Sequence, residues 1–177
     1  MTEEQFEELK TDYIENLEKY MSETGGLFPH ISIFANKKED SKLSIIHVPI
    51  PDEMMSDRGK DMFVDDIMPS IYKKVKEEFI PYGVGWASEA WLREADKDAD
   101  ISNWKQIPIK KEVLFISIES ELSSCTHVYE IKRNGKQVTE DGDIVDIVEL
   151  KEISELTNPG NTEGRFSGLY KKLNKDV

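Results

Sequence analysis

The chain has 177 residues, 38% of them apolar and 33% charged, which fits one domain with room for a buried core. Its 36 acidic and 23 basic side chains give a net charge of −13. A negative field of this size repels phosphate backbones and anionic lipid, so it argues against direct nucleic-acid binding and against docking on a membrane. Two interpretations of the charge are left, a basic protein partner or simple solubility.

Three features predict a soluble, cytoplasmic protein. The one cysteine, Cys125, cannot form an internal disulfide and fits a reducing compartment. No apolar run approaches the ~20 residues that a membrane helix needs. The residues after Met1, TEEQFEELK, are acidic and are followed by no apolar segment, unlike a secretory signal peptide.

Two amphipathic helices are predicted in the first half of the chain. Apolar residues recur every three or four positions over residues 2–21, where Thr2 is suited to cap the first turn and a glycine pair follows the last. The same spacing runs over residues 56–79, but Pro69 falls in the middle of the segment. Because proline lacks an amide hydrogen and clashes with the preceding turn, we expect a kink at residues 65–68 or two consecutive helices.

A first hairpin is predicted between the two helices. The segments His30–Ala35 and Lys42–Val48 are rich in β-branched and aromatic residues and flank a polar stretch. If all six residues between them form the loop, His30 lies opposite His47. Proline residues then end the second strand, because proline cannot donate to a strand ladder.

The middle of the sheet is predicted from two long strands, Val84–Glu94 and Glu112–Glu119. Apolar residues occupy both faces of each, and the first carries Trp86 on one face and Trp91 on the other. A strand that is covered on both sides is best placed centrally in a sheet.

The strongest hairpin signal in the chain is Asn134-Gly135, since both residues tolerate the positive φ angles of a two-residue turn. It is predicted to join strands over residues 125–133 and 136–140. A further strand is predicted over residues 143–150.

Together these elements predict an α+β fold, with a mostly antiparallel sheet of about six strands and two main helices packed on it. Residues 1–153 are expected to form a single domain, and residues 154–177 a loosely ordered or docking tail. The apolar residues of the tail that could dock as a short helix are Phe166, Leu169, Tyr170 and Leu173.

Two patterns are candidates for metal binding. The predicted hairpin brings His30 and His47 within reach of one ion, with His127 as a further candidate, but the spacing matches no known zinc signature, so surface or half-buried histidines are the alternative. The acidic stretch at residues 96–100 begins like a calcium loop but lacks the required glycine and the bidentate glutamate, which predicts an acidic surface loop. No cofactor is expected.

Cys125 and His127 lie two residues apart on one predicted strand and therefore point to the same side. A thiolate beside an imidazole is the minimum for nucleophilic catalysis. The surrounding residues match no catalytic family, and a buried structural thiol is the alternative.

The best polar cluster predicted from the sequence consists of Glu89, Arg93 and Glu112 on the central strands. A carboxylate in such a setting could have a raised pKa and act as a general acid or base, or it could form a structural ion pair with Arg93. The chain has no phosphate-binding glycine loop, no G-x-S-x-G, no C-x-x-C and no H-E-x-x-H motif. Catalysis therefore has no positive support in the sequence, and no catalytic residue is assigned.

The segments SEAWLRE (Ser88–Glu94) and KKEVLFISIES (Lys110–Ser120) resemble a two-strand pattern of small uncharacterised proteins encoded by bacteriophages. The resemblance covers residues 67–120. It implies a phage or mobile-element origin, and hence a location in the host cytoplasm or the virion, but it transfers no activity and no functional residue.

Three functions are consistent with these observations. The first is a non-catalytic, phage-type accessory protein that binds another macromolecule, either a host protein or a virion component, through its acidic surface and the helix at residues 2–21; self-association is also open. The second is a small hydrolase or nucleotide-binding protein with a pocket around Glu89, Arg93 and Glu112. The third is an acidic DNA mimic, although lysines are interleaved with the acids.

Overall fold

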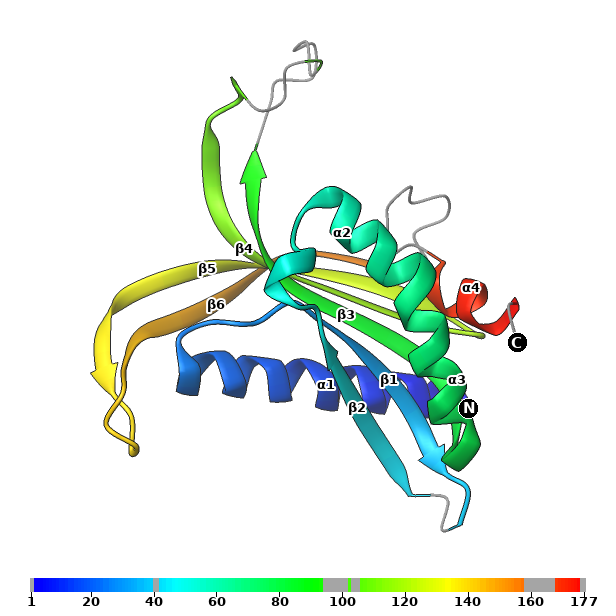
Figure 1. Ribbon diagram of the computed structural model, residues 1–177. Coiled ribbons are helices and arrows are strands. Elements are labelled where there is room, and N and C mark those ends of the chain that lie inside the picture. Colours follow the sequence, from blue (N-terminus) through cyan, green and yellow to red (C-terminus); the bar gives the residue numbers. More distant parts are fainter. Residues whose placement is uncertain (1, 40–41, 94–101, 103–105, 158–167, 176–177) are drawn as a thin grey trace.

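The computed structural model describes residues 2–39, 42–93, 102, 106–157 and 168–175 and shows an α+β fold built on one antiparallel sheet (Figure 1). Its six strands have the order β2-β1-β3-β4-β5-β6. The elements are α1 (Glu3–Thr24), β1 (His30–Lys37), β2 (Leu43–Pro49), η1 (Asp52–Met54), α2 (Asp57–Met62), η2 (Phe63–Ile67), α3 (Met68–Glu78), β3 (Phe79–Arg93), β4 (Ile109–Ser120), β5 (Ser124–Val138), β6 (Ile144–Thr157) and α4 (Leu169–Lys175). The predicted fold class and strand number are confirmed.

The sheet is curled, with α1 on one side and α3 on the other (Figure 1). It has apolar side chains on both faces, and each face has its own hydrophobic cluster. One cluster joins the apolar stripe of α1 to the sheet and includes Phe6, Leu9, Tyr13, Leu17, Met21, Phe34, Ala87, Leu114, Ile116 and Ile118. The other joins η2, α3 and α4 to the opposite face and includes Ile31, Ile33, Phe63, Met68, Tyr72, Val84, Leu169 and Leu173. The alternation of side chains along β1 decides which residue faces which helix.

The first helix forms as its sequence predicts. The Thr2 hydroxyl accepts a hydrogen bond from the amide of Gln5, and the Gln5 side chain accepts one from the amide of Thr2, which completes a capping box. Gly25 ends the helix in the left-handed conformation, with φ of 74°, and its amide bonds back to Met21. The sequence itself therefore determines where α1 begins and ends.

The second predicted helix is interrupted near its proline, as expected, and consists of three consecutive segments. The expected arrangement of two main helices packed on the sheet is therefore not confirmed. A π-helical segment, η2, separates α2 from α3, and Pro69 lies in the first turn of α3. Because Pro69 has no amide hydrogen, the regular bonding pattern cannot pass through it, and the chain widens by one residue just before it.

Among the helices in the described part of the chain, none combines the length and the apolar composition that crossing a lipid bilayer requires.

The register of the β1–β2 hairpin differs from the predicted one by two residues. The amide of Lys37 bonds to the carbonyl of Lys42 at 3.0 Å, so the connection is shorter than six residues. His47 therefore lies opposite Ser32, and His30 lies opposite Pro49. This shift places a hydroxyl between the two histidines.

The predicted central strands, β3 and β4, do lie at the centre of the sheet. β3 begins earlier than predicted, at Phe79, and Pro81 is accommodated where the pairing with β1 is irregular, at Ala35. Trp86 is half-buried, whereas Trp91 is 61% exposed. The expectation that the strand is covered on both sides is therefore wrong at Trp91.

The predicted turn at Asn134-Gly135 is wrong. β5 continues through these residues, which form a bulge with φ of 103° at Gly135, and the chain reverses later around Gly142, where φ is 89°. β6 then runs past residue 153, across the predicted boundary of the tail. In the tail, Leu169 and Leu173 of α4 are buried in the core, whereas Phe166 lies outside the described residues.

Replacing Ile116, which is fully buried on β4 in the α1 cluster, tests this placement. We expect Ile116→Ala to lower the free energy of unfolding by about 2–5 kcal/mol, because it leaves a cavity between the sheet and α1. The matched variant Ile80→Ala, at a strand position that is 59% exposed, should change stability by only about 0.5 kcal/mol. Equal losses in urea denaturation would contradict the arrangement.

Candidate functional site

Three polar clusters lie on the sheet face that α1 covers. Each is placed there by strand alternation, beside apolar residues that pack against the helix: His30 and Ser32 share the side of Phe34, Glu89 that of Ala87, and His127 that of Cys125. We name them the Tyr13 chain (Tyr13, His30, Ser32, His47), the Arg133 cluster (Glu89, Glu112, Arg133, Asp146) and the His127 cluster (His127, Glu152, Glu155).

The Tyr13 chain borders a groove with a volume of about 720 Å³ between the second half of α1, the loop that follows it, and β2. Two aromatic residues of the groove are unusually open, Phe28 at 68% exposed and Tyr20 at 43%. The lining residues are Tyr13, Asn16, Leu17, Lys19, Tyr20, Glu23, Leu27, Phe28, His30, Ile45, His47 and Pro49. Much of the lining is apolar, with the histidines supplying polar groups.

Four side chains are linked in the Tyr13 chain by successive hydrogen bonds. The Tyr13 hydroxyl lies 3.3 Å from Nε2 of His30 and 2.9 Å from the Ser32 hydroxyl. The Ser32 hydroxyl in turn lies 2.9 Å from Nδ1 of His47, and Nδ1 of His30 lies 2.9 Å from the carbonyl of Phe28. Tyr13, Ser32 and His30 are buried, whereas His47 is exposed at the groove.

The hydrogen bond between His30 and the carbonyl of Phe28 determines the direction of every other hydrogen bond in the Tyr13 chain. A carbonyl only accepts, so Nδ1 of His30 donates to Phe28. Burial lowers the pKa of His30 and favours the neutral ring, so its Nε2 accepts from Tyr13. Tyr13 then accepts from Ser32, and Ser32 accepts from Nδ1 of His47. Burial likewise lowers the pKa of His47, and in its neutral form Nε2 carries a lone pair.

This arrangement does not suit the metal site considered for His30 and His47. The rings do meet, with centroids 5.0 Å apart, but both nitrogens of His30 and Nδ1 of His47 are engaged in hydrogen bonds. One nitrogen, Nε2 of His47, is left as an acceptor on the groove. The sequence pointed to the two histidines but not to Tyr13 or Ser32, which come from different elements.

The Arg133 cluster contains two of the predicted site residues, Glu89 and Glu112. Both bond to the guanidinium of Arg133, at 2.9 Å and 2.7 Å, and Arg93 instead donates to the carbonyl of Ile107. The expected pairing of Glu89 with Arg93 is replaced by this longer-range contact.

The Arg133 cluster holds the loop that follows α1. Glu89 accepts a hydrogen bond of 2.6 Å from the amide of Leu27, and Arg133 also donates to the carbonyl of Gly25. Burial raises the pKa of Glu89, while the Leu27 amide and the Arg133 charge act in the opposite direction. These bonds give the cluster a structural role, because they tie the end of α1 to the sheet.

The thiol of Cys125 is buried, and burial raises its pKa to about 12. A thiol with this pKa is not ionised near neutral pH and is a poor nucleophile. Cys125 packs in the α1 cluster, as the alternative interpretation of its sequence context predicts. The acidic stretch at residues 96–100, the other calcium or metal candidate, lies outside the described residues.

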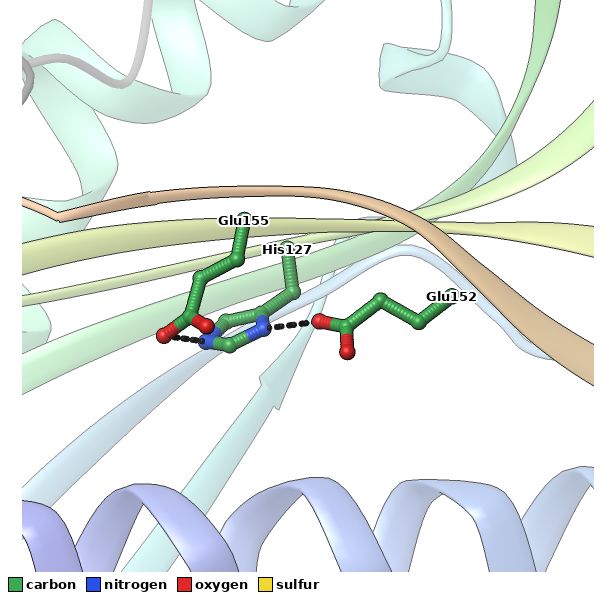
Figure 2. Close-up of side chains that lie close together, drawn as sticks. All are labelled: His127, Glu152 and Glu155. Carbon is green, nitrogen blue, oxygen red and sulfur yellow. Dashed lines mark hydrogen bonds and ion pairs between the residues drawn. The ribbon is translucent and has the colours of Figure 1, made fainter.

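His127 lies between two carboxylates of β6, and all three side chains point to the side of the sheet on which α1 lies (Figure 2). Its Nδ1 is 2.7 Å from Glu152, and its Nε2 is 3.6 Å from Glu155. In the described part of the chain, these three residues form a group whose potential metal-ligand atoms all lie within 4.8 Å of one another. The sequence pointed to His127 but not to its β6 partners, because their pairing depends on sheet register.

Comparison of the chain with protein-family models, curated proteins and solved structures finds no match.

Tyr13→Phe tests the hydrogen-bonded chain. The substitution keeps the packed ring but leaves His30 and Ser32 without their buried partner, so we expect a loss of about 1–3 kcal/mol in the free energy of unfolding. Tyr20→Phe, on the same helix at an exposed position, is the matched control and should be nearly neutral. A neutral Tyr13→Phe would show that the chain is not formed.

Stability should depend on pH through the same histidines. Because the pKa values of His30 and His47 are lowered in the folded state, only the unfolded chain takes up protons readily as the pH falls below about 6.5. The contribution of these two histidines therefore lowers the free energy of unfolding as the pH falls from 7.5 to about 5. Glu18 and Glu89, whose pKa values are raised, act in the opposite direction.

We expect the double variant with His30→Gln and His47→Gln to lose less stability than the wild type over this pH interval, measured by urea denaturation at each pH. The carboxylates are common to both proteins, so the difference isolates the histidines. Parallel pH profiles would contradict the assignment.

Proposed function

We propose that the chain is a non-catalytic binding protein that engages a basic partner protein through the acidic face of α1 and the adjoining groove. The observation that carries this proposal is the groove itself, with Phe28 and Tyr20 exposed at its surface. Large exposed aromatic side chains beside a concave, mostly apolar surface are typical of interfaces.

Charge decides the kind of partner. α1 carries eight acidic residues and two lysines, and seven of the acids are exposed: Glu3, Glu4, Glu7, Glu8, Asp12, Glu15 and Glu23. The potential along this helix attracts cations and speeds the encounter with a basic surface. The apolar groove at the end of the same helix would then supply most of the affinity, since exposed charge pairs contribute little each.

The position of the groove fits an extended segment of the partner. β2 is an edge strand of the sheet, and Ile45, His47 and Pro49 line the groove because alternate residues share one side. An apolar side chain of the segment would enter the groove, and a donor group would meet Nε2 of His47. The resemblance to phage-encoded proteins suggests a host protein or a virion component as the partner.

The two other candidate functions are less well supported. A hydrolase or nucleotide-binding site around Glu89 and Glu112 would need a free cation for the substrate, but Arg133 is already engaged by both carboxylates and by the carbonyl of Gly25. A DNA mimic accounts for the exposed acids of α1 but not for the aromatic groove next to them.

The test is affinity capture from host lysate, identification of the captured protein, and titration of the purified pair by calorimetry. We expect a basic protein that binds at a one-to-one ratio and more weakly as salt increases. Phe28→Ser should weaken binding by about tenfold or more, as truncation of an interface anchor does. Ile144→Ser, which alters an equally exposed apolar residue on β6, outside the groove, is the control and should bind normally.

Two outcomes would overturn the proposal. Unchanged affinity in Phe28→Ser would exclude the groove as the contact. Competition for the partner by duplex DNA, combined with full binding by Phe28→Ser, would identify the chain as a DNA mimic instead.

A further inference from the structure

We propose that His127 and Glu155 form a binding site for a divalent transition metal of the zinc type, with Glu152 positioning the imidazole (Figure 2). This site lies at β5 and β6, and none of its three residues lines the groove of the proposed partner site.

The hydrogen bond to Glu152 sets the state of the ring. A carboxylate accepts hydrogen bonds, so Nδ1 of His127, 2.7 Å from Glu152, carries a hydrogen and donates it. In the neutral imidazole, Nε2 then has a lone pair that is directed toward Glu155. A carboxylate on one nitrogen and a ligand position on the other is the usual arrangement of a metal-binding histidine.

The separation of Nε2 from the Glu155 oxygen suits a bridging metal better than a hydrogen bond. At 3.6 Å it exceeds the usual range of N–H···O bonds, which ends near 3.2 Å. Zinc lies about 2.0–2.2 Å from nitrogen and oxygen ligands, and at a tetrahedral angle these bond lengths place the two ligand atoms roughly 3.4 Å apart. The observed gap therefore matches two ligands of one ion with almost no movement.

Burial is the second, independent observation. His127 is only 4% exposed, and in the described part of the structure its Nε2 is buried without a hydrogen-bond partner. A buried acceptor that is left unsatisfied is unfavourable, so this position favours a ligand. Glu155 is 44% exposed by its side chain, which leaves the ion a path from solvent and room for water at its remaining positions.

Lys10 is expected to lower the affinity of this site for a metal ion. Its ammonium lies 3.4 Å from the same Glu155 oxygen and is held by Glu7 at 2.5 Å. A bound cation has to displace this contact with Glu155, and the repulsion between the two positive charges weakens binding. The site is therefore expected to be weaker than a structural zinc site with four protein ligands.

The test is calorimetric titration of untagged protein with Zn²⁺, together with visible absorption of the Co²⁺ complex as a report on coordination. We expect one Zn²⁺ per chain. Glu155→Gln should weaken binding by about tenfold or more, and Glu152→Gln by a similar factor if it positions the ring. Lys10→Met should strengthen binding, a result that a merely structural ion pair would not produce.

Two controls separate the site from adventitious binding. Glu149→Gln removes a carboxylate of β6 that bonds to Asn134 and should leave Zn²⁺ affinity unchanged. Cys125→Ser should also bind normally, because the thiol is not among the proposed ligands. No Zn²⁺ binding by the wild type, or equal affinity in Glu155→Gln, would overturn the proposal and show that a proton bridges His127 and Glu155.

Discussion

The close approach of α1 to the centre of the sheet is the constraint on which the rest of the structure depends. Gly85 of β3 makes it possible, because an added Cβ there would lie 2.8 Å from Cζ of Phe34 and 3.0 Å from Cε1 of Tyr13. With no side chain in the way, the Phe34 ring packs edge-on against Tyr13, at 5.1 Å between centroids. Because Gly85 has no side chain, the Tyr13 ring can lie close enough to the sheet to form its hydrogen bonds with His30 and Ser32 of β1.

One helix cannot cover the whole of such a sheet. A helix is about 10 Å wide, whereas six strands at about 4.8 Å spacing extend over more than twice that width. The apolar stripe of α1 therefore covers the middle, and polar side chains occupy its flanks. His30 and His47 lie on the β1–β2 flank, and His127 lies on the β5–β6 flank. Both candidate sites are consequences of this incomplete cover.

The sequence predicted what depends on local pattern and missed what depends on register. α1 was predictable because Thr2 caps it through contacts within its own first turn. The central strands were predictable because apolar residues occupy both faces of β3 and β4. Asn134-Gly135 favoured a turn, but pairing with β6 extends β5 through it and makes a bulge. The partner of Glu89 is Arg133 on another strand, which no local spacing reveals.

The two proposed sites lie on one helix, and distance decides whether they influence each other. Lys10, beside the His127 cluster, and Tyr20, on the groove, are ten residues apart in α1, or about 15 Å along the axis. The Debye length at physiological ionic strength is about 8 Å, so the charge of a bound cation is largely screened over this distance. Since the groove contributes through apolar contact, metal binding changes the potential of the first half of α1 and leaves the groove unaffected. A bound cation would therefore slow the electrostatic encounter with a basic partner, whereas the affinity that the groove supplies would be unchanged.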